Sequence, residues 1–154
     1  MQAIKITDLT YIYSKKTPSE KVALDNVNLS INEGEFVTVV GHTGSGKSTL
    51  VQHLNGLIKA QTGVVEICGI PTSNKKNLKQ LRFDVGMVFQ YPEYQLFEDT
   101  VAKDVAFGPK NMGLDGEELE KRVMETCKII GVKEEYLQKS PFDLSGGEKR
   151  RVAI

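Results

Sequence analysis

The chain has 154 residues with 40% apolar and 26% charged side chains, and its formal net charge is zero. These values predict a single soluble globular domain, and the neutral balance gives no overall field that would favour nucleic acid or an anionic membrane. No apolar run approaches the roughly 20 residues that span a bilayer, and the N-terminus lacks the apolar core of a signal peptide, so we expect neither a transmembrane helix nor a secretion signal.

The two cysteines, Cys68 and Cys127, are far apart in the sequence and have neither metal-ligand nor CxxC spacing. Isolated cysteines in such a chain do not indicate a disulfide framework or a zinc site. We therefore expect two buried thiols in a reducing cytosol.

The first 35 residues are predicted to form an antiparallel β layer. Residues 3–13 and 22–31 both show the alternation of apolar and polar side chains that is typical of strands. Polar turns occupy residues 14–20 and 32–35, and the second turn leads into the next apolar segment. Two strands joined by a short polar turn favour an antiparallel pair attached to an α/β core.

A glycine-rich motif at residues 41–49 organises the rest of the chain. Its sequence, GHTGSGKST, fits the pattern G-x-x-x-x-G-K-[ST] at every fixed position. Residues 36–40 before it are apolar and β-branched, which predicts a buried strand. Strand, loop and helix are the context that a phosphate-binding motif requires. Apolar residues at helical spacing predict the helix: Leu50, Val51, Leu54, Leu57 and Ile58.

This motif predicts the binding of nucleotide phosphates. Its glycines let the backbone curl around an anion so that successive N–H groups point inward. Lys47 would add a positive charge at the β- and γ-phosphates, and the Ser48 hydroxyl would ligate Mg²⁺. A loop that merely turns a strand into a helix is the alternative, and the flanking segments disfavour it. The predicted site comprises Gly41, His42, Thr43, Gly44, Ser45, Gly46, Lys47, Ser48 and Thr49.

The middle of the chain contains two more predicted strands and an aromatic loop. Residues 64–67 and 83–89 are largely apolar and are predicted to be strands, the second of which ends at Gln90. Residues 91–97 (YPEYQLF) combine three aromatic rings with a proline. Large apolar side chains on a loop favour a contact surface, and the alternative is that they fold back into the core.

Two helices are predicted next. Thr100 is a suitable N-cap for a helix that stops near Gly108 and Pro109. Asp115 and Glu118 form an aspartate version of the capping box at the start of a second helix. One apolar stripe along this second helix predicts a core face, followed by a glycine stop: Leu119, Val123, Cys127, Ile130 and then Gly131.

A second informative motif is LSGGE at residues 144–148. Ser145 and Glu148 form a capping box, so a helix is predicted to begin here. Gly146 and Gly147 at its first positions are poor helix formers. Close approach of a ligand to exposed N–H groups would explain them, and a purely structural device at a helix start is the alternative.

In this order, GHTGSGKST, VFQ and LSGGE resemble the ATP-binding subunits of ABC transporters over essentially the whole chain. The stretches VFQYPEYQLFEDTVAKDVAFGPKNMGL and SPFDLSGGEKRRVAI resemble the second type of ATPase subunit in energy-coupling factor (ECF) transporters, which take up vitamins and transition-metal ions. The resemblance implies an α/β fold: a P-loop NTPase (ABC ATPase) core with an antiparallel β layer and part of a helical subdomain, incomplete at the C-terminus. It implies one domain over residues 1–154, with the β layer at 1–35 and the P-loop core at 36–90. The remaining part, 91–154, would comprise the loop after Gln90 (the Q-loop) and the helical region with the LSGGE signature.

The resemblance also implies roles for individual residues. Tyr13 matches the aromatic residue that stacks on adenine, although its place at the end of a strand favours simple packing. Gln90 matches the glutamine that ligates Mg²⁺ together with Ser48. Residues 91–97 would lie near the coupling helices of a transmembrane partner. The residues that would contact ATP held by the other ATPase subunit are Ser145, Gly146, Gly147 and Glu148.

The implied cofactors are ATP and Mg²⁺. The implied partners are a paralogous ATPase subunit in a head-to-tail heterodimer, a transmembrane coupling subunit and, indirectly, a substrate-binding membrane subunit, with no nucleic acid. In such a pair, ATP binding would close the dimer and hydrolysis would reopen it. The resemblance thus implies a peripheral protein at the cytoplasmic face of the cell membrane.

The end of the chain departs from the family pattern. The sequence stops inside the helix that LSGGE begins, whereas the family continues with an Asp-Glu pair and a later histidine. His42 and His53 both precede Gln90, which is the wrong part of the chain for that histidine. We therefore expect a truncated chain that holds none of the catalytic residues and has no useful ATPase activity by itself.

Three alternatives stand beside this interpretation. A soluble ABC-type mechanical ATPase acting on DNA or ribosomes would favour a basic patch or long coiled-coil heptads, and the sequence has neither. A small-molecule P-loop kinase accounts for neither LSGGE nor the N-terminal β layer. The third alternative is an ATP-binding regulator without catalysis.

Overall fold

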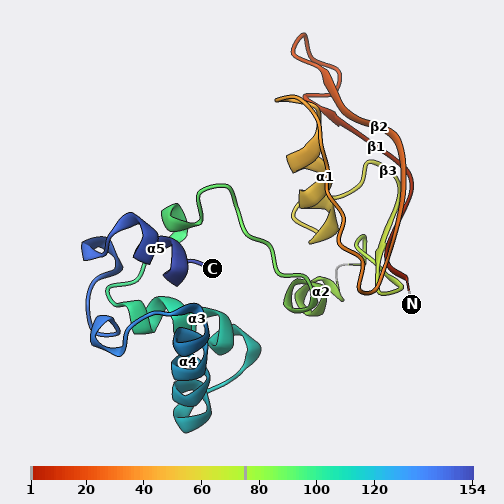
Figure 1. The fold of residues 1–154 in the computed structure, drawn as a ribbon. Coiled ribbons are helices and arrows are strands. Elements are labelled where there is room, and N and C mark those ends of the chain that lie inside the picture. The colour runs from red at the N-terminus through yellow and green to blue at the C-terminus, as the bar shows by residue number, and fades with distance from the viewer. Residues whose placement is uncertain (1, 75) are drawn as a thin grey trace. The chain divides into compact units, whose positions relative to one another are not determined.

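The computed structural model describes residues 2–74 and 76–154. The chain forms two compact units, Met1–Met87 and Val88–Ile154 (Figure 1). The first unit contains the sheet and the glycine loop, and the second contains the aromatic loop and the LSGGE helix. In the described residues, no helix is both long enough and apolar enough to cross a membrane.

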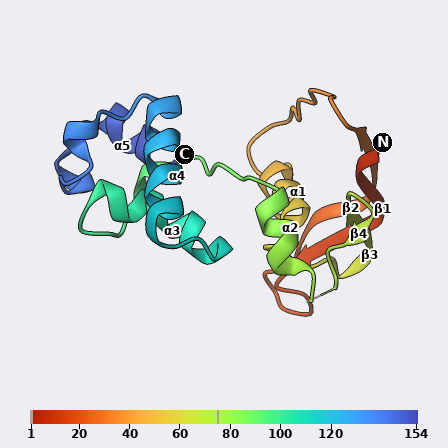
Figure 2. The same cartoon turned by 90° about the horizontal axis from the view of Figure 1, so that it is seen from below.

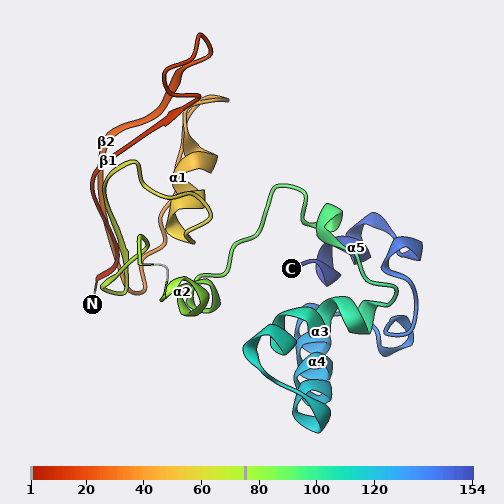
Figure 3. The same ribbon diagram turned by 180° about the vertical axis from the view of Figure 1, so that it is seen from behind.

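A four-stranded antiparallel sheet organises the first unit. β1 (Gln2–Tyr13) pairs with β2 (Lys21–Asn32) on one side and with β3 (Thr62–Ile67) on the other, and β4 (Ile70–Pro71) pairs with β3. The long β1–β2 ribbon is seen from behind in Figure 3. The predicted N-terminal β layer and the predicted strand at residues 64–67 are both confirmed.

Two helices, α1 (Lys47–Leu54) and α2 (Leu78–Asp84), cover one face of this sheet (Figure 2). Ile6 of β1 lies opposite Val65 of β3, and both side chains are buried. Because successive strand residues alternate between faces, this register directs one apolar set towards the helices. The buried core of the unit comprises Ile6, Leu9, Leu24, Val65, Ile67 and Leu81.

Two predicted strands do not form. Residues 36–40 run as irregular chain, with Phe36 94% and Val40 92% exposed. In the predicted strand 83–89, the first two residues complete α2 and the rest is irregular. A β-branched segment becomes a strand only where a neighbouring strand pairs with its N–H and C=O groups. Within the described parts of the chain, neither segment has such a neighbour.

The helix after the glycine loop is shorter than predicted. α1 ends at Leu54, so Leu57 and Ile58 lie beyond it. Gly56 follows the helix with φ of +68°, a left-handed conformation that ends helices. An added Cβ at Gly56 would lie 2.7 Å from Leu78 Cδ2 of α2. The left-handed turn at Gly56, close to α2, therefore ends α1 where apolar spacing did not predict an end.

Three helices form the second unit around one apolar core: α3 (Val101–Met112), α4 (Gly116–Ile130) and α5 (Gly146–Val152). The predicted stripe on α4 is confirmed, since Val123 and Cys127 are buried and the other two members pack beside them. Three short 3-10 turns complete the unit: η1 (Pro92–Gln95), η2 (Glu134–Tyr136) and η3 (Pro141–Asp143). The buried core comprises Leu96, Val101, Ala106, Val123, Cys127, Val132, Leu137, Leu144 and Val152.

The start of α3 matches the prediction and its end does not. The Thr100 hydroxyl accepts the Lys103 backbone N–H at 3.3 Å, which caps the helix as expected. α3 then continues through Pro109 to Met112 and ends at Gly113, whose φ is +96°. Proline removes one backbone donor from a helix, but its fixed φ is helical, so the flanking turns carry the helix past it.

Two local predictions are corrected. Asp115 occupies the N-cap position of α4 without a side-chain cap bond, so the predicted capping box with Glu118 does not form. Cys68 is exposed at the turn between β3 and β4, whereas Cys127 is buried as expected. Burial also raises the pKa of the Cys127 thiol. Both cysteines are free thiols.

The substitution Gly63→Ala is expected to destabilise the first unit. Gly63 has φ of +79°, and an added Cβ would overlap the backbone carbonyl oxygens of Thr7 and Asp8. Strain of this kind costs about 1–3 kcal/mol, and the overlap adds a similar amount. Urea unfolding of the wild-type and Gly63→Ala chains measures the loss in free energy of unfolding.

Gly69→Ala is the matched control for this substitution. Gly69 also has positive φ (+77°), but its added Cβ meets no heavy atom within 4 Å in the described chain. Equal losses of unfolding free energy in the two variants would contradict the proposed steric clash.

Candidate nucleotide-binding site

The glycine loop leads from β2 into α1 through two left-handed glycines. Gly44 has φ of +83° and Gly46 has φ of +91°, and Gly46 is the N-cap of α1. A backbone with positive φ at these positions favours glycine over any other residue. Residues 41–46 form the turn, and residues 47–49 begin the helix, so the nine predicted residues lie together in one loop and helix start.

Gly46 is required for a second reason, which is its closeness to β2. An added Cβ at Gly46 would overlap the backbone carbonyl oxygen of Ala23 and would lie 3.2 Å from Leu24 Cδ2. The loop can therefore rest directly on β2. The sheet thereby supports the start of α1, where unpaired backbone N–H groups favour anions.

The Lys47 side chain turns back into the loop. Its Nζ donates to the Gly41 carbonyl at 2.7 Å and to the His42 carbonyl at 2.8 Å. The Ser45 hydroxyl lies 3.5 Å away. The ammonium charge is thus held inside the turn, at the place where the glycines leave the backbone open to an anion.

A cavity of about 190 Å³ lies beside this loop. Two lysines, Lys21 and Lys47, contribute positive charge, and among the described residues no acidic side chain lines it. This set fits a phosphate group, because exposed N–H groups and ammonium donors both favour anions. Lys21 and Ala23 belong to β2 and carry no motif, so the sequence alone did not indicate them. The lining residues are Tyr13, Lys21, Ala23, Gly44, Gly46, Lys47, Ser48 and Thr49.

Tyr13 lies at the end of β1 on the wall of this cavity. Its hydroxyl is hydrogen-bonded to the Thr49 hydroxyl at 3.2 Å. Its ring packs edge-to-face on Tyr11, with centroids 4.9 Å apart, and the residue remains 39% exposed. Tyr13 is therefore both packed and accessible from the cavity, and its role towards adenine stays a prediction.

Gln90 and the aromatic loop belong to the second unit, whereas Ser48 belongs to the first. Gln90 is exposed in an irregular segment. The pairing of Ser48 and Gln90 on Mg²⁺ therefore stays a prediction.

The aromatic loop divides between surface and core. Leu96 and Pro92 are buried, whereas the three rings at Tyr91, Tyr94 and Phe97 are exposed. Phe107 of α3 extends the exposed set by packing edge-to-face on Phe97, with centroids 5.0 Å apart. We call Tyr91, Tyr94, Phe97 and Phe107 the aromatic surface.

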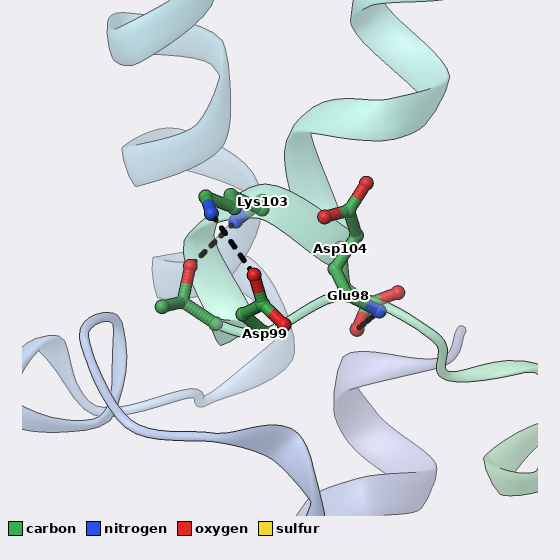
Figure 4. Close-up of polar contacts among 5 residues, drawn as sticks. Glu98, Asp99, Lys103 and Asp104 are labelled. Carbon is green, nitrogen blue, oxygen red and sulfur yellow. Dashed lines mark hydrogen bonds and ion pairs between the residues drawn. The ribbon is translucent and has the colours of Figure 1, made fainter.

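The first turn of α3 holds the end of the aromatic loop (Figure 4). The Asp104 carboxylate accepts the backbone N–H groups of Glu98 at 3.2 Å and of Phe97 at 3.4 Å. Lys103 of this turn pairs with Asp99, which precedes the helix, at 3.4 Å. The loop backbone is therefore fixed by α3, while its rings remain exposed.

The LSGGE motif forms the predicted capping box. The Glu148 carboxylate accepts the Ser145 backbone N–H at 2.9 Å and the Ser145 hydroxyl at 2.6 Å. These hydrogen bonds hold the pKa of Glu148 at about 2, because they favour its charged form. An added Cβ at Gly146 or Gly147 meets no heavy atom within 4 Å in the described chain, so packing within the unit does not explain these glycines.

An ion pair joins the LSGGE helix to the aromatic loop. Arg150 of α5 contacts Glu93 of η1 at 3.4 Å, across 57 residues of sequence. This pair was not predicted from the sequence, because a contact between distant charged residues leaves no local pattern. The ion pair therefore holds the aromatic loop against the LSGGE helix within the second unit.

Comparison with known proteins identifies relatives over the whole chain. The ABC transporter family model matches residues 24–154. The energy-coupling factor transporter ATP-binding protein EcfA2 of Caldanaerobacter subterraneus subsp. tengcongensis is 57% identical over 98% of this chain and 53% of its own length. The protein of the same name from Clostridium tetani is 55% identical over 99% of this chain and 54% of its own length. The chain therefore spans about half the length of these curated relatives, and the resemblance predicted from its motifs is confirmed.

Solved structures show the same fold. The structure of cbiO1 from Clostridium perfringens, described as part of the ABC transporter complex cbiONQ, matches with a TM-score of 0.82 and 39% identity over 99% of this chain and 59% of that chain. A dimeric ATP-binding cassette bound to ADP and Pi matches with a TM-score of 0.83 and 36% identity over 97% of this chain and 66% of that chain. The predicted fold class is confirmed by these similarities.

Removal of the Ser145 hydroxyl is expected to raise the pKa of Glu148. In Ser145→Ala the carboxylate loses its hydroxyl donor, so its pKa should rise from about 2 towards the ordinary value of about 4.3. Because the folded-state pKa is lowered, the stabilisation is present above about pH 4.3 and is lost as the pH falls towards 2. NMR titration of the Glu148 side-chain carbon measures the pKa.

The variant Ser145→Thr keeps a hydroxyl and is the matched control. It should retain the low pKa of Glu148. An unchanged titration in Ser145→Ala would show that the hydroxyl does not hold the carboxylate in its charged form.

Proposed function

Because the chain belongs to the ABC transporter family, we propose that it is the ATP-binding part of a subunit that couples ATP binding and hydrolysis to transport across a membrane. The observation that carries this proposal is the glycine loop, with Lys47 Nζ held inside it and a cavity lined by two lysines beside it. These features favour a polyphosphate ligand.

Different residues would contact different parts of ATP and its Mg²⁺. Backbone N–H groups at the start of α1 and the Lys47 ammonium would hold the phosphates, and Lys21 would add charge from β2. Ser48 and Gln90 would hold Mg²⁺, which neutralises the charge of the phosphate oxygens. Tyr13 would stack on adenine at the outer wall of the cavity.

The LSGGE helix would serve a second ATP, held by a partner ATPase subunit. The open space over Gly146 and Gly147 supports this role, because it leaves the helix start accessible to a ligand. Ser145 and Glu148 would sit beside that phosphate as well. One similar solved cassette is itself dimeric. We propose a head-to-tail heterodimer with a paralogous ATPase subunit.

The aromatic surface would meet a transmembrane coupling subunit. Its exposed rings are held on a backbone fixed by Asp104, which suits a preformed contact site. The names of the relatives support an energy-coupling factor transporter. We propose uptake of vitamins or transition-metal ions through a separate substrate-binding membrane subunit, with this chain peripheral at the cytoplasmic face.

The substitution Lys47→Ala is expected to weaken Mg²⁺–ATP binding. Charge-assisted hydrogen bonds are worth about 1.5–3 kcal/mol each, which predicts at least about tenfold weaker binding. Isothermal calorimetry on the 154-residue chain measures the dissociation constant. Lys103→Ala is the control, because Lys103 belongs to the second unit and forms a surface ion pair there. Equal affinities of wild type and Lys47→Ala would contradict the proposal.

Loss of the most exposed ring of the aromatic surface is expected to weaken association with a membrane partner. Tyr94 is 82% exposed, so Tyr94→Ser removes contact area without opening the core. The measurement is the yield of membrane protein that co-purifies with the tagged chain from detergent-solubilised native membranes. Phe142→Ser, which removes an exposed ring outside this surface, is the control. Co-purification of nucleic acid instead would favour a soluble mechanical ATPase.

A further inference from the structure

Four residues beside the cavity contact one another in a closed circuit, in which Thr49 takes part through both its hydroxyl and its backbone carbonyl. The Tyr13 hydroxyl is hydrogen-bonded to the Thr49 hydroxyl at 3.2 Å, and the Thr49 carbonyl lies 2.7 Å from His53 Nδ1. The His53 ring packs edge-to-face on Tyr11 with centroids 5.0 Å apart, and Tyr11 packs edge-to-face on Tyr13. We call Tyr11, Tyr13, Thr49 and His53 the Tyr13 bracket. It joins the end of β1 to α1.

Hydrogen bonding fixes the tautomer of His53. A carbonyl oxygen only accepts, so Nδ1 must donate to Thr49, and the neutral ring then carries its lone pair on Nε2. His53 is 0% exposed, and its Nε2 has no hydrogen-bond partner in the part of the chain that the structure describes. A buried acceptor without a partner is unfavourable.

Packing alone therefore does not explain a histidine here. The α-helix already supplies the Thr49 carbonyl with the backbone N–H of residue 53, so the imidazole bond is not needed to satisfy it. A leucine would fill the site without a buried acceptor. What the imidazole adds is two directed contacts, one to Thr49 and one to the Tyr11 ring, and both lead to Tyr13.

We propose that His53 is a positioning residue that fixes the orientation of the Tyr13 ring, and so sets the wall of the cavity that would face the nucleotide base. One path runs through Thr49 to the Tyr13 hydroxyl, and the other runs through Tyr11 to the Tyr13 ring. Tyr13 is the only aromatic ring on the described lining of this cavity. The inference rests on the proposed ATP-binding function, and it assigns His53 to recognition of the base and not of the phosphates.

Three variants separate the two paths. His53→Asn keeps an amide N–H at the place of Nδ1 but loses the ring contact with Tyr11. His53→Phe keeps an aromatic ring against Tyr11 but donates no hydrogen bond. His53→Leu loses both, and Gln52→Leu on the same helix is the control. Thermal unfolding of each variant establishes that it is folded.

The first measurement is NMR of the nucleotide-free chain with ¹³C-labelled tyrosine rings. His53→Leu should shift the Tyr13 and Tyr11 resonances, the two single-path variants should shift them less, and Gln52→Leu should leave them in place. Long-range ¹⁵N–¹H spectra should show the proton on Nδ1 of His53. Unmoved Tyr13 resonances in His53→Leu, or a proton on Nε2 in the wild type, would overturn the proposal.

The second measurement compares ATP with inorganic triphosphate, which has no base. Directed ring contacts are worth about threefold to tenfold in affinity. His53→Leu should therefore weaken ATP binding by this factor and change the affinity for triphosphate by less than about twofold. An equal loss of affinity for both ligands would mean that His53 merely supports the loop, and would overturn the assignment. If the wild-type chain binds neither ligand, the proposed function fails for this chain, and the tyrosine resonances alone decide whether His53 positions Tyr13.

Discussion

The absence of a side chain at Gly46 is the constraint on which the first unit depends. The loop backbone approaches the Ala23 carbonyl of β2 so closely that a Cβ would overlap it. Because of this approach, the start of α1 rests on the sheet, and Lys47 can turn back to the carbonyls of Gly41 and His42. The same approach brings the end of β1 beside Thr49, where Tyr13 closes the wall of the cavity.

Directed polar contacts play the corresponding part in the second unit. Asp104 fixes the backbone at the end of the aromatic loop, and Arg150 ties that loop to the LSGGE helix through Glu93. An ion pair with a half-exposed arginine, such as Arg150–Glu93, adds little to stability. The contribution of these contacts is geometric, because they hold a set of exposed rings and a glycine-rich helix start on one packed core.

The two glycine motifs keep the start of a helix open by different means. In the loop, Gly44 and Gly46 adopt left-handed conformations that other residues rarely take. At the start of α5, Gly146 has no positive φ and no neighbour at its Cβ position in the described chain, so its lack of a side chain leaves open space. Both motifs expose backbone N–H groups at the start of a helix, where negative charge is favoured.

The sequence by itself determined the features that local chemistry fixes. These are the two motifs, the alternation in β1 and β2, the apolar stripe of α4 and the capping box at Ser145, each of which depends on residues only a few positions apart. The tertiary structure decided the rest. Residues 36–40 have strand propensity but no partner strand in the described parts of the chain, α1 ends before the left-handed turn at Gly56, and α3 continues past Pro109. The Tyr13 bracket and the Glu93–Arg150 pair join residues that are distant in sequence, and such contacts exist only once the chain has folded, because no local pattern encodes them.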